Sequence, residues 1–180
     1  MNQYQKNNIF RGVTSFLTGN QTNKWAAEYI NDRTKPEAIR MYVNNLFPTK
    51  DTFTEVDVSV PYRDALALHY KRYNELKNKK LRKDGDKQLM AYPLEGEHVQ
   101  NLPYWQVGEY LNNPHFNLRN SINHVDYIDE GNKVRALDTY DWHYKTPIDI
   151  KDPITIIRRT AEEFGVPFNI DIQVDKPRGN

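Results

Sequence analysis

The spacing of hydrophobic and polar positions changes along the chain, and the change separates predicted helices from predicted strands. In the first half, apolar residues recur every three or four positions, as they do on one face of an α-helix. This spacing predicts helices over residues 23–31 and 34–47, and from about residue 62 into a basic stretch near residue 77. Residues 1–21 hold few apolar anchors, and their spacing fits either a short helix or an extended arm.

Two local signals refine this pattern. Thr34 and Glu37 stand three residues apart with Pro36 between them, which predicts a capping box at the start of a helix. Residues 54–60 alternate Thr and Val with polar residues, and this period of two predicts a half-buried strand.

The C-terminal third predicts a small sheet. Residues 116–127 and 134–143 are predicted as the two strands of a hairpin, joined by a turn over residues 129–132. An Asp-Pro pair then predicts the start of a helix that ends at Gly165. Residues 168–174 alternate apolar and polar positions as a closing strand.

Together these elements predict a single α+β domain, with helices first and then a small, mostly antiparallel sheet on which one helix packs. We expect residues 1–21 to form an arm-like N-terminal segment, residues 22–176 to form the domain and residues 177–180 to form a tail. Within the domain, the helical part covers about 22–113 and the hairpin–helix–strand part about 114–176. A length of 180 residues agrees with one domain.

Charge and residue content exclude several classes of protein. The 25 Lys and Arg residues nearly balance the 24 Asp and Glu residues, so the basic surplus of a nucleic-acid binder is missing. No run approaches the roughly 20 apolar residues of a membrane span, and the first ten residues do not resemble a secretory signal peptide. The absence of cysteine excludes thiol catalysis and disulfides. The spacing of the histidines predicts no structural metal site.

Aromatic residues are abundant for a chain with few aliphatic ones. Hydrophobic residues make up 38% of the chain, yet it holds 12 Tyr and 3 Trp. Such rings are favoured in protein–protein interfaces, although an AT-rich genome would also enrich Tyr and Asn. Residues 87–103 lack a regular pattern, and a loop of this length is usually functional. We therefore predict partner contacts at Tyr92, Tyr104 and Trp105.

A basic run lies where the helix from residue 62 ends. Lys79, Lys80 and Arg82 could bind phosphates or an acidic partner, but Asp84 and Asp86 dilute their charge. A solvated helix end is the simpler interpretation.

One short segment carries candidate chemistry. Asp138, Tyr140, Asp141 and His143 fall within six positions at the end of a predicted strand. Strand alternation would place Asp138 and Tyr140 on one face, and Asp141 with His143 on the other. A carboxylate beside an imidazole can orient a general base or help to hold a divalent metal. The structural alternative is that Asp binds the backbone at the strand end and Tyr packs in the core.

The same segment resembles the catalytic end of the colicin M family. The similarity rests on LDTYDWHYKTPIDI and TAEEFGVPFNIDI, within about residues 117–174. It implies hydrolysis of lipid II with Mg²⁺ as cofactor, and Asp138, Tyr140 and Asp141 as active-site residues. The family's histidine lies several residues beyond the second Asp and precedes Arg, whereas His143 lies two residues beyond Asp141 and precedes Tyr.

The Asn-, Tyr- and Lys-rich style of the chain is similar to small virion-associated proteins of tailed bacteriophages, crAss-like phages among them. This likeness implies a structural or assembly component of a phage particle near the portal, collar or tail. Such a component would contact other protein subunits, need no cofactor, and be found in the virion and, during assembly, in the host cytoplasm. A colicin M-like lipid II hydrolase and an intracellular inhibitor or immunity-type binding module are the two alternatives.

Overall fold

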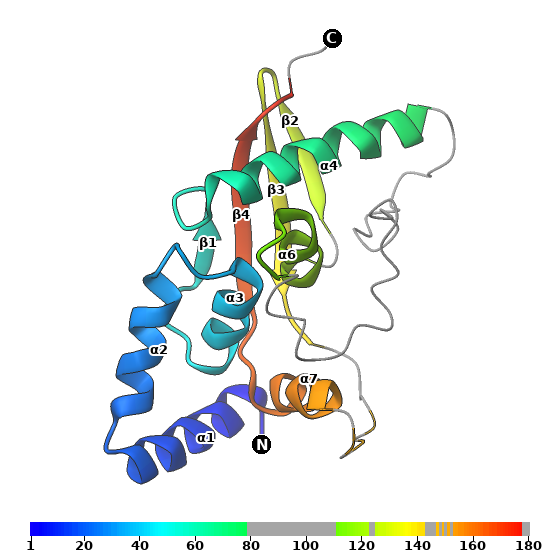
Figure 1. Cartoon of the computed structure of the whole chain (residues 1–180). Helices are drawn as coiled ribbons and strands as arrows, with labels where there is room; N and C mark the ends of the chain where they lie inside the picture. The colour runs from blue at the N-terminus through cyan, green and yellow to red at the C-terminus, as the bar shows by residue number, and fades with distance from the viewer. Residues whose placement is uncertain are drawn as a thin grey trace.

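The protein is built on a mixed four-stranded sheet, as its computed structural model shows (Figure 1). The structure describes residues 1–78, 111–122, 125–142, 147, 149, 151 and 153–177. The α+β class predicted from the sequence is confirmed. No helix in these ranges is long and apolar enough to cross a membrane.

The elements follow one another along the chain as helices and strands of unequal length. The helices are α1 (Gln3–Thr18), α2 (Gln21–Asn31), α3 (Glu37–Leu46), α4 (Val60–Asn78), α6 (Pro114–Ser121) and α7 (Pro153–Phe164). The strands are β1 (Thr52–Thr54), β2 (Asp126–Glu130), β3 (Lys133–Tyr140) and β4 (Phe168–Asp175). Their order in the sheet is β1-β4-β3-β2, with β1 parallel to β4 and the other pairs antiparallel. The late element β4 is therefore an interior strand.

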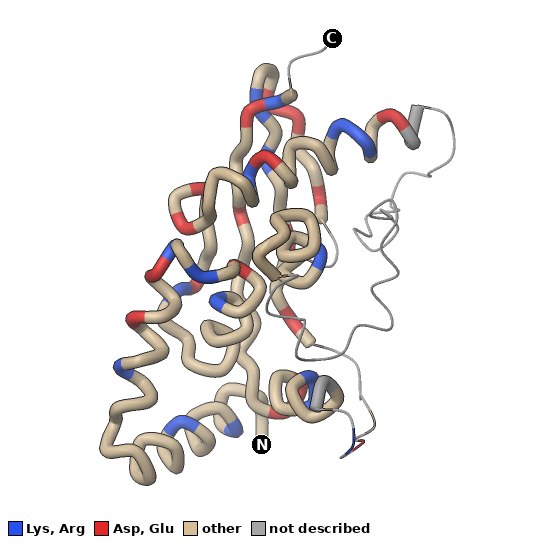
Figure 2. Tube along the Cα trace, in the orientation of Figure 1, with Lys and Arg blue, Asp and Glu red and all other residues tan. Residues whose placement is uncertain are grey.

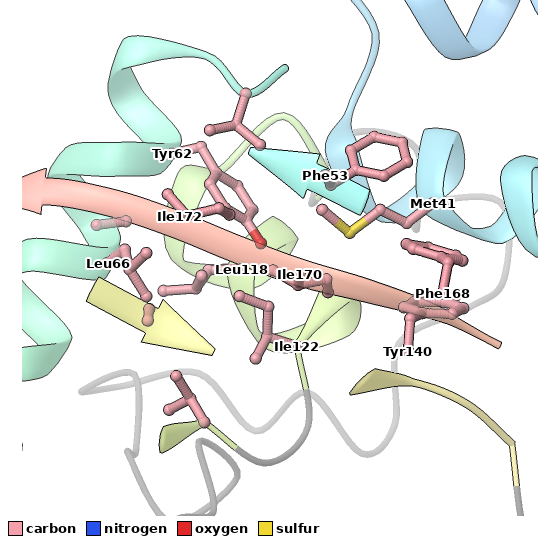
Figure 3. Packing of buried hydrophobic residues seen from close by; sticks show 14 of the residues in the cluster. Met41, Phe53, Tyr62, Leu66, Leu118, Ile122, Tyr140, Phe168, Ile170 and Ile172 are labelled. Carbon is pink, nitrogen blue, oxygen red and sulfur yellow. The ribbon is translucent and has the colours of Figure 1, made fainter. Parts of the chain in front are cut away.

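The core lies between the sheet and the helices α3, α4 and α6 (Figure 3). Strand β4 supplies it by alternation, as predicted, because every second side chain points to the same face. Its inward side chains are all at most 5% exposed: Phe168, Ile170, Ile172 and Val174. Strand β3 adds Val134 and Ala136 from the neighbouring position in the sheet.

The predicted hairpin is confirmed by β2 and β3, but its first strand begins later in the chain than predicted. Its first strand starts at Asp126, and Glu130 pairs with Lys133 across a loop of Gly131 and Asn132. Gly131 has a φ of 81°, a left-handed conformation that favours glycine in such short loops.

The strand predicted over residues 116–127 is wrong for most of its length, because Pro114–Ser121 forms the helix α6. The Asn113 side chain caps this helix by accepting hydrogen bonds from the backbone N–H groups of His115 and Phe116, at 3.0 and 3.3 Å. Pro114 occupies the first turn, where the missing N–H costs no hydrogen bond. The Asn-Pro pair thus begins a helix.

The strand predicted over residues 54–60 is also wrong, because β1 ends at Thr54 and a turn follows. The Asp57 carboxylate accepts a hydrogen bond from the Thr54 backbone N–H at 2.9 Å and forms an ion pair with Lys50 at 2.7 Å. These bonds close the chain into a turn, and Val60 already begins α4.

The predicted capping box of Thr34 and Glu37 is wrong as well. Pro36 occupies the N-cap position of α3 and makes no side-chain cap. The Thr34 backbone N–H instead donates to the Asp32 carboxylate at 3.0 Å, in a local turn. Glu37 is thereby released for contacts in the interior.

Of the two forms expected for the first residues, the structure shows the helix. Asn2 and Gln5 form a capping box at its start. The buried Asn7 side chain donates to the backbone oxygens of Leu46 and Phe164, at 2.9 and 2.6 Å. These bonds attach α1 to the C-terminal ends of α3 and α7.

Candidate functional site

The candidate chemistry at the end of β3 lies on the side of the sheet that the helices cover. Asp138 pairs with Ile170 and Tyr140 pairs with Phe168, and both partners are buried in the core. Since paired residues of antiparallel strands point to the same face, Asp138 and Tyr140 share that face. This agrees with the alternation expected from the sequence.

Tyr140 is a packed side chain. It is 7% exposed, and its ring stacks on Phe168 with 4.9 Å between centroids and 14° between planes (Figure 3). Burial raises the pKa of the Tyr140 phenol above its usual value, and the neighbouring Trp142 indole offsets part of that rise. The Trp142 ring meets the Tyr140 ring edge-on, with 6.1 Å between the ring centroids.

Asp138 is half-buried on the same face, and its charge affects the pKa of a second phenol, that of Tyr62. Tyr62 is fully buried, and its hydroxyl lies 2.5 Å from the Ser121 Oγ. Burial raises the pKa of Tyr62, the Ser121 hydrogen bond lowers it, and the charges of Glu37 and Asp138 raise it further. Both phenols are therefore held in the neutral form at physiological pH, in which they serve as packing groups and hydrogen-bonding partners.

Glu37 and Asn117 form a buried polar pair that joins α3 to α6. Glu37 is 2% exposed, and its carboxylate accepts hydrogen bonds from the Asn117 side-chain amide and, at 2.7 Å, from the Ser59 backbone N–H. The Asn117 Oδ1 accepts in turn from the Ala38 backbone N–H at 2.7 Å. Every bond of this set holds one element to another, which gives the set a structural role.

Arg40 is a second buried charge on α3, and it is 1% exposed. Its Nε donates to the backbone oxygen of Ile30 at 2.8 Å, and its Nη1 donates to the backbone oxygen of Asp57 at 2.6 Å. The guanidinium also lies 5.8 Å from the centre of the Phe53 ring. Burial lowers the pKa of Arg40, and the nearby Glu37 charge opposes this.

Of the four residues predicted as a catalytic cluster, the structure describes all but His143. Asp141 is half-buried just beyond the end of β3. His143 lies outside the described residues, so its pairing with Asp141 stays a prediction. Across the described ranges, no three His, Asp or Glu side chains gather where they could share a metal ion. The hydrolase expectation and its Mg²⁺ therefore stay predictions.

The predicted binding residues lie outside the described residues: Tyr92, Tyr104, Trp105, Lys79, Lys80 and Arg82. Their partner contacts also stay predictions.

A different surface, which the sequence reasoning missed, is formed by the first two helices. Among the described residues, thirteen large hydrophobic side chains are exposed, and seven of them lie in residues 1–25. The α1 stripe is our name for three of these with the glycine between them: Ile9, Gly12, Val13 and Phe16. The four residues are spaced i, i+3, i+4 and i+7, so they share one face of the helix. That spacing is visible in the sequence, but the pattern alone does not show that the described residues leave the face exposed.

The stripe lies in a part of the chain whose charged side chains are all positive. Residues 1–27 contain Lys6, Arg11 and Lys24 but no carboxylate, and no acidic residue lies along α1 (Figure 2). Lys6 forms an ion pair with Glu163 of α7 at 2.7 Å. Phe10, on the side of α1 that faces the core, packs between Phe47 and Phe164. One face of α1 is thus fastened to the body, while the other is apolar and exposed.

An aromatic cluster joins α4 to the edge strand β2. The His69 Nδ1 lies 2.5 Å from the Tyr127 hydroxyl, and the rings of Tyr70 and Tyr73 pack against Tyr127 at 5.1 and 5.7 Å. Tyr70 also donates to Asp129 at 3.0 Å. His69 is 3% exposed, so its imidazole is buried in this cluster.

Neither a protein-family model, nor a curated protein, nor a solved structure matches this chain.

Proposed function

We propose that this protein is a multi-copy assembly component that acts through protein–protein contacts, in the particle of a tailed bacteriophage. The observation that carries the proposal is the exposed apolar surface of the first two helices. It includes Phe16 at 88% exposure and Leu17 at 73%. Monomeric proteins rarely leave large apolar side chains gathered in one patch, and such patches mark interaction sites.

The packing of the β3 end supports a role without catalysis. Tyr140 is stacked on Phe168, and the Glu37–Asn117 pair joins two helices. These polar groups hold the fold together, whereas a catalytic constellation needs groups that converge on a reacting atom. The phage context rests on the Asn-, Tyr- and Lys-rich character of the chain and its many aromatic rings.

Mass spectrometry of purified phage particles tests the proposal. We expect the protein in mature particles, at a copy number above one relative to a tail protein of known stoichiometry. An abundant phage enzyme of the infected cell serves as the contamination control. Absence of the protein from washed particles would overturn the proposal.

A further inference from the structure

We propose that the α1 stripe is the contact between two copies of this chain, with the two α1 helices antiparallel about a two-fold axis. This inference deepens the proposed function and rests on it. The four residues Ile9, Gly12, Val13 and Phe16 form the seam of the contact.

The stripe has the shape of a helix-packing seam. Ile9, Val13 and Phe16 are 55%, 54% and 88% exposed. A Cβ placed on Gly12 would meet no atom within 4 Å, so the surface is open there to a neighbouring helix. Figure 1 places α1 at the end of the molecule farthest from the β2–β3 hairpin, so a second copy can approach it from outside.

The stripe is complementary to itself in one orientation. A two-fold axis between residues 12 and 13 sets Phe16 of one copy opposite Ile9 of the other. The same axis sets Val13 opposite Gly12, so that a branched side chain faces the residue that lacks one. An interface in which each patch meets its own image is the one that closes a two-fold dimer.

The helix dipoles favour this arrangement. The stripe has no charged residue, and antiparallel helices place the positive end of each helix dipole beside the negative end of the other. An anionic lipid surface would favour more cations, since segments that bind anionic lipid headgroups carry clusters of about 4–8 Lys or Arg. Residues 1–27 have three, and Glu163 already engages Lys6. A second protein chain therefore fits the stripe better than a lipid surface does.

Sedimentation of the purified full chain over a range of concentrations provides the first test. We expect a monomer–dimer equilibrium whose dissociation constant rises at least roughly tenfold in Phe16→Glu. Leu68→Glu is the matched control, because Leu68 is an exposed hydrophobic residue on α4, at 47% exposure. Equal thermal unfolding of the two variants would show that both fold.

Cysteine cross-linking tests the orientation, and the chain suits it because it contains no cysteine. Ile9→Cys and Phe16→Cys are made as separate, differently tagged chains, mixed and oxidised. Antiparallel helices predict disulfides between the two variants. They predict none within either variant alone, since like positions would lie about 10 Å apart along the axis. Leu68→Cys is expected to stay monomeric.

Several results would overturn the inference. These are a wild-type chain that stays monomeric throughout, equal weakening by Phe16→Glu and Leu68→Glu, or disulfides that form only between identical variants. Binding of a monomeric chain to phosphatidylglycerol vesicles, lost in Phe16→Glu, would assign the stripe to lipid instead. Particles that incorporate Phe16→Glu normally would overturn this inference and leave the proposed function standing, whereas particles without the wild-type protein would overturn the function.

Discussion

Asn45 occupies the space beside Gly165 that a side chain at residue 165 would need. A Cβ placed on Gly165 would lie 1.9 Å from the Asn45 Oδ1 and 2.5 Å from the Ala161 oxygen. The two segments are also tied by a hydrogen bond from the Val166 N–H to the Asn45 backbone oxygen at 2.7 Å. The Asn45 Nδ2 donates to the Val166 oxygen at 2.9 Å. The end of α7 therefore depends on a glycine for its close contact with α3.

Gly165→Ala is expected to destabilise the protein by about 1–3 kcal/mol, because a packed interior must move to admit the methyl group. Gly12→Ala, in open space within α1, is the matched control and should stabilise the chain by up to about 1 kcal/mol. Chemical denaturation of dilute protein measures both. Similar effects of the two substitutions would contradict the close contact of Gly165.

Glu37→Gln is expected to cost about 1–3 kcal/mol, because the new amide turns one acceptor into a donor that faces another donor. The carboxylate of Glu37 now accepts from both Ser59 and Asn117. Glu28→Gln, on the exposed face of α2, should stay within about 0.5 kcal/mol of the wild type. The free energy of unfolding of each variant checks the difference, and an equal cost would exclude the proposed role of Glu37.

The lowered pKa of Asp57 predicts that the protein loses stability in acid. Burial raises the pKa of this carboxyl, but the bonds from Lys50 and Thr54 outweigh it and hold the pKa below its usual value. At a pH between the folded and the unfolded pKa of Asp57, the folded protein binds fewer protons than the unfolded chain. The stabilisation by Asp57 is therefore complete above the unfolded pKa, at a pH of about 4. It is lost as the pH falls through the folded pKa.

Urea unfolding between neutral and strongly acidic pH measures this loss. In Asp57→Asn the curve should be flatter in acid and lower at neutral pH. Asp51→Asn, at an exposed neighbouring position, serves as the control. An acid limb unchanged in Asp57→Asn would assign the loss to other carboxyls.

Two substitutions of Tyr140 distinguish a packing role of this side chain from a catalytic one. Tyr140→Ala is expected to cost about 3–5 kcal/mol, since it empties the space beside Phe168. Tyr140→Phe keeps the stacked ring and should cost less than about 1.5 kcal/mol. Thermal unfolding compares the two. A lipid II assay with Mg²⁺ adds the readout that packing alone would not change: hydrolysis by the wild type that Tyr140→Phe abolishes would favour the hydrolase alternative.

A periodicity that is sustained over many residues made parts of the fold predictable. Strand β4 could be predicted because its alternation continues through eight residues, and every second side chain is buried in the core. Residues 54–60 show the same alternation, but the Asp57 side chain binds Thr54 and Lys50 and turns the chain there. Local side-chain bonds of this kind compete with strand pairing.

The candidate surfaces were harder to predict, because exposure depends on the rest of the fold. The apolar spacing of Ile9, Val13 and Phe16 is the same whether the face is buried or open. Its exposure follows from Asn7 and Phe10, which fix the core-facing side of α1 to the body. Asp138 and Tyr140 were placed correctly by alternation, while the stacking of Tyr140 on Phe168 depends on pairing across 28 residues.

The interior position of β4 has a consequence for the order of folding. The strand pairs with β1, more than a hundred residues earlier, and with β3 on its other side. Helices α1 to α4 thus leave the ribosome before the strand that completes their core has been made. Such distant pairing slows folding and leaves apolar surface exposed meanwhile. A nascent chain that stops before residue 168 would lack the middle of its sheet, so acquisition of the native structure must wait for β4.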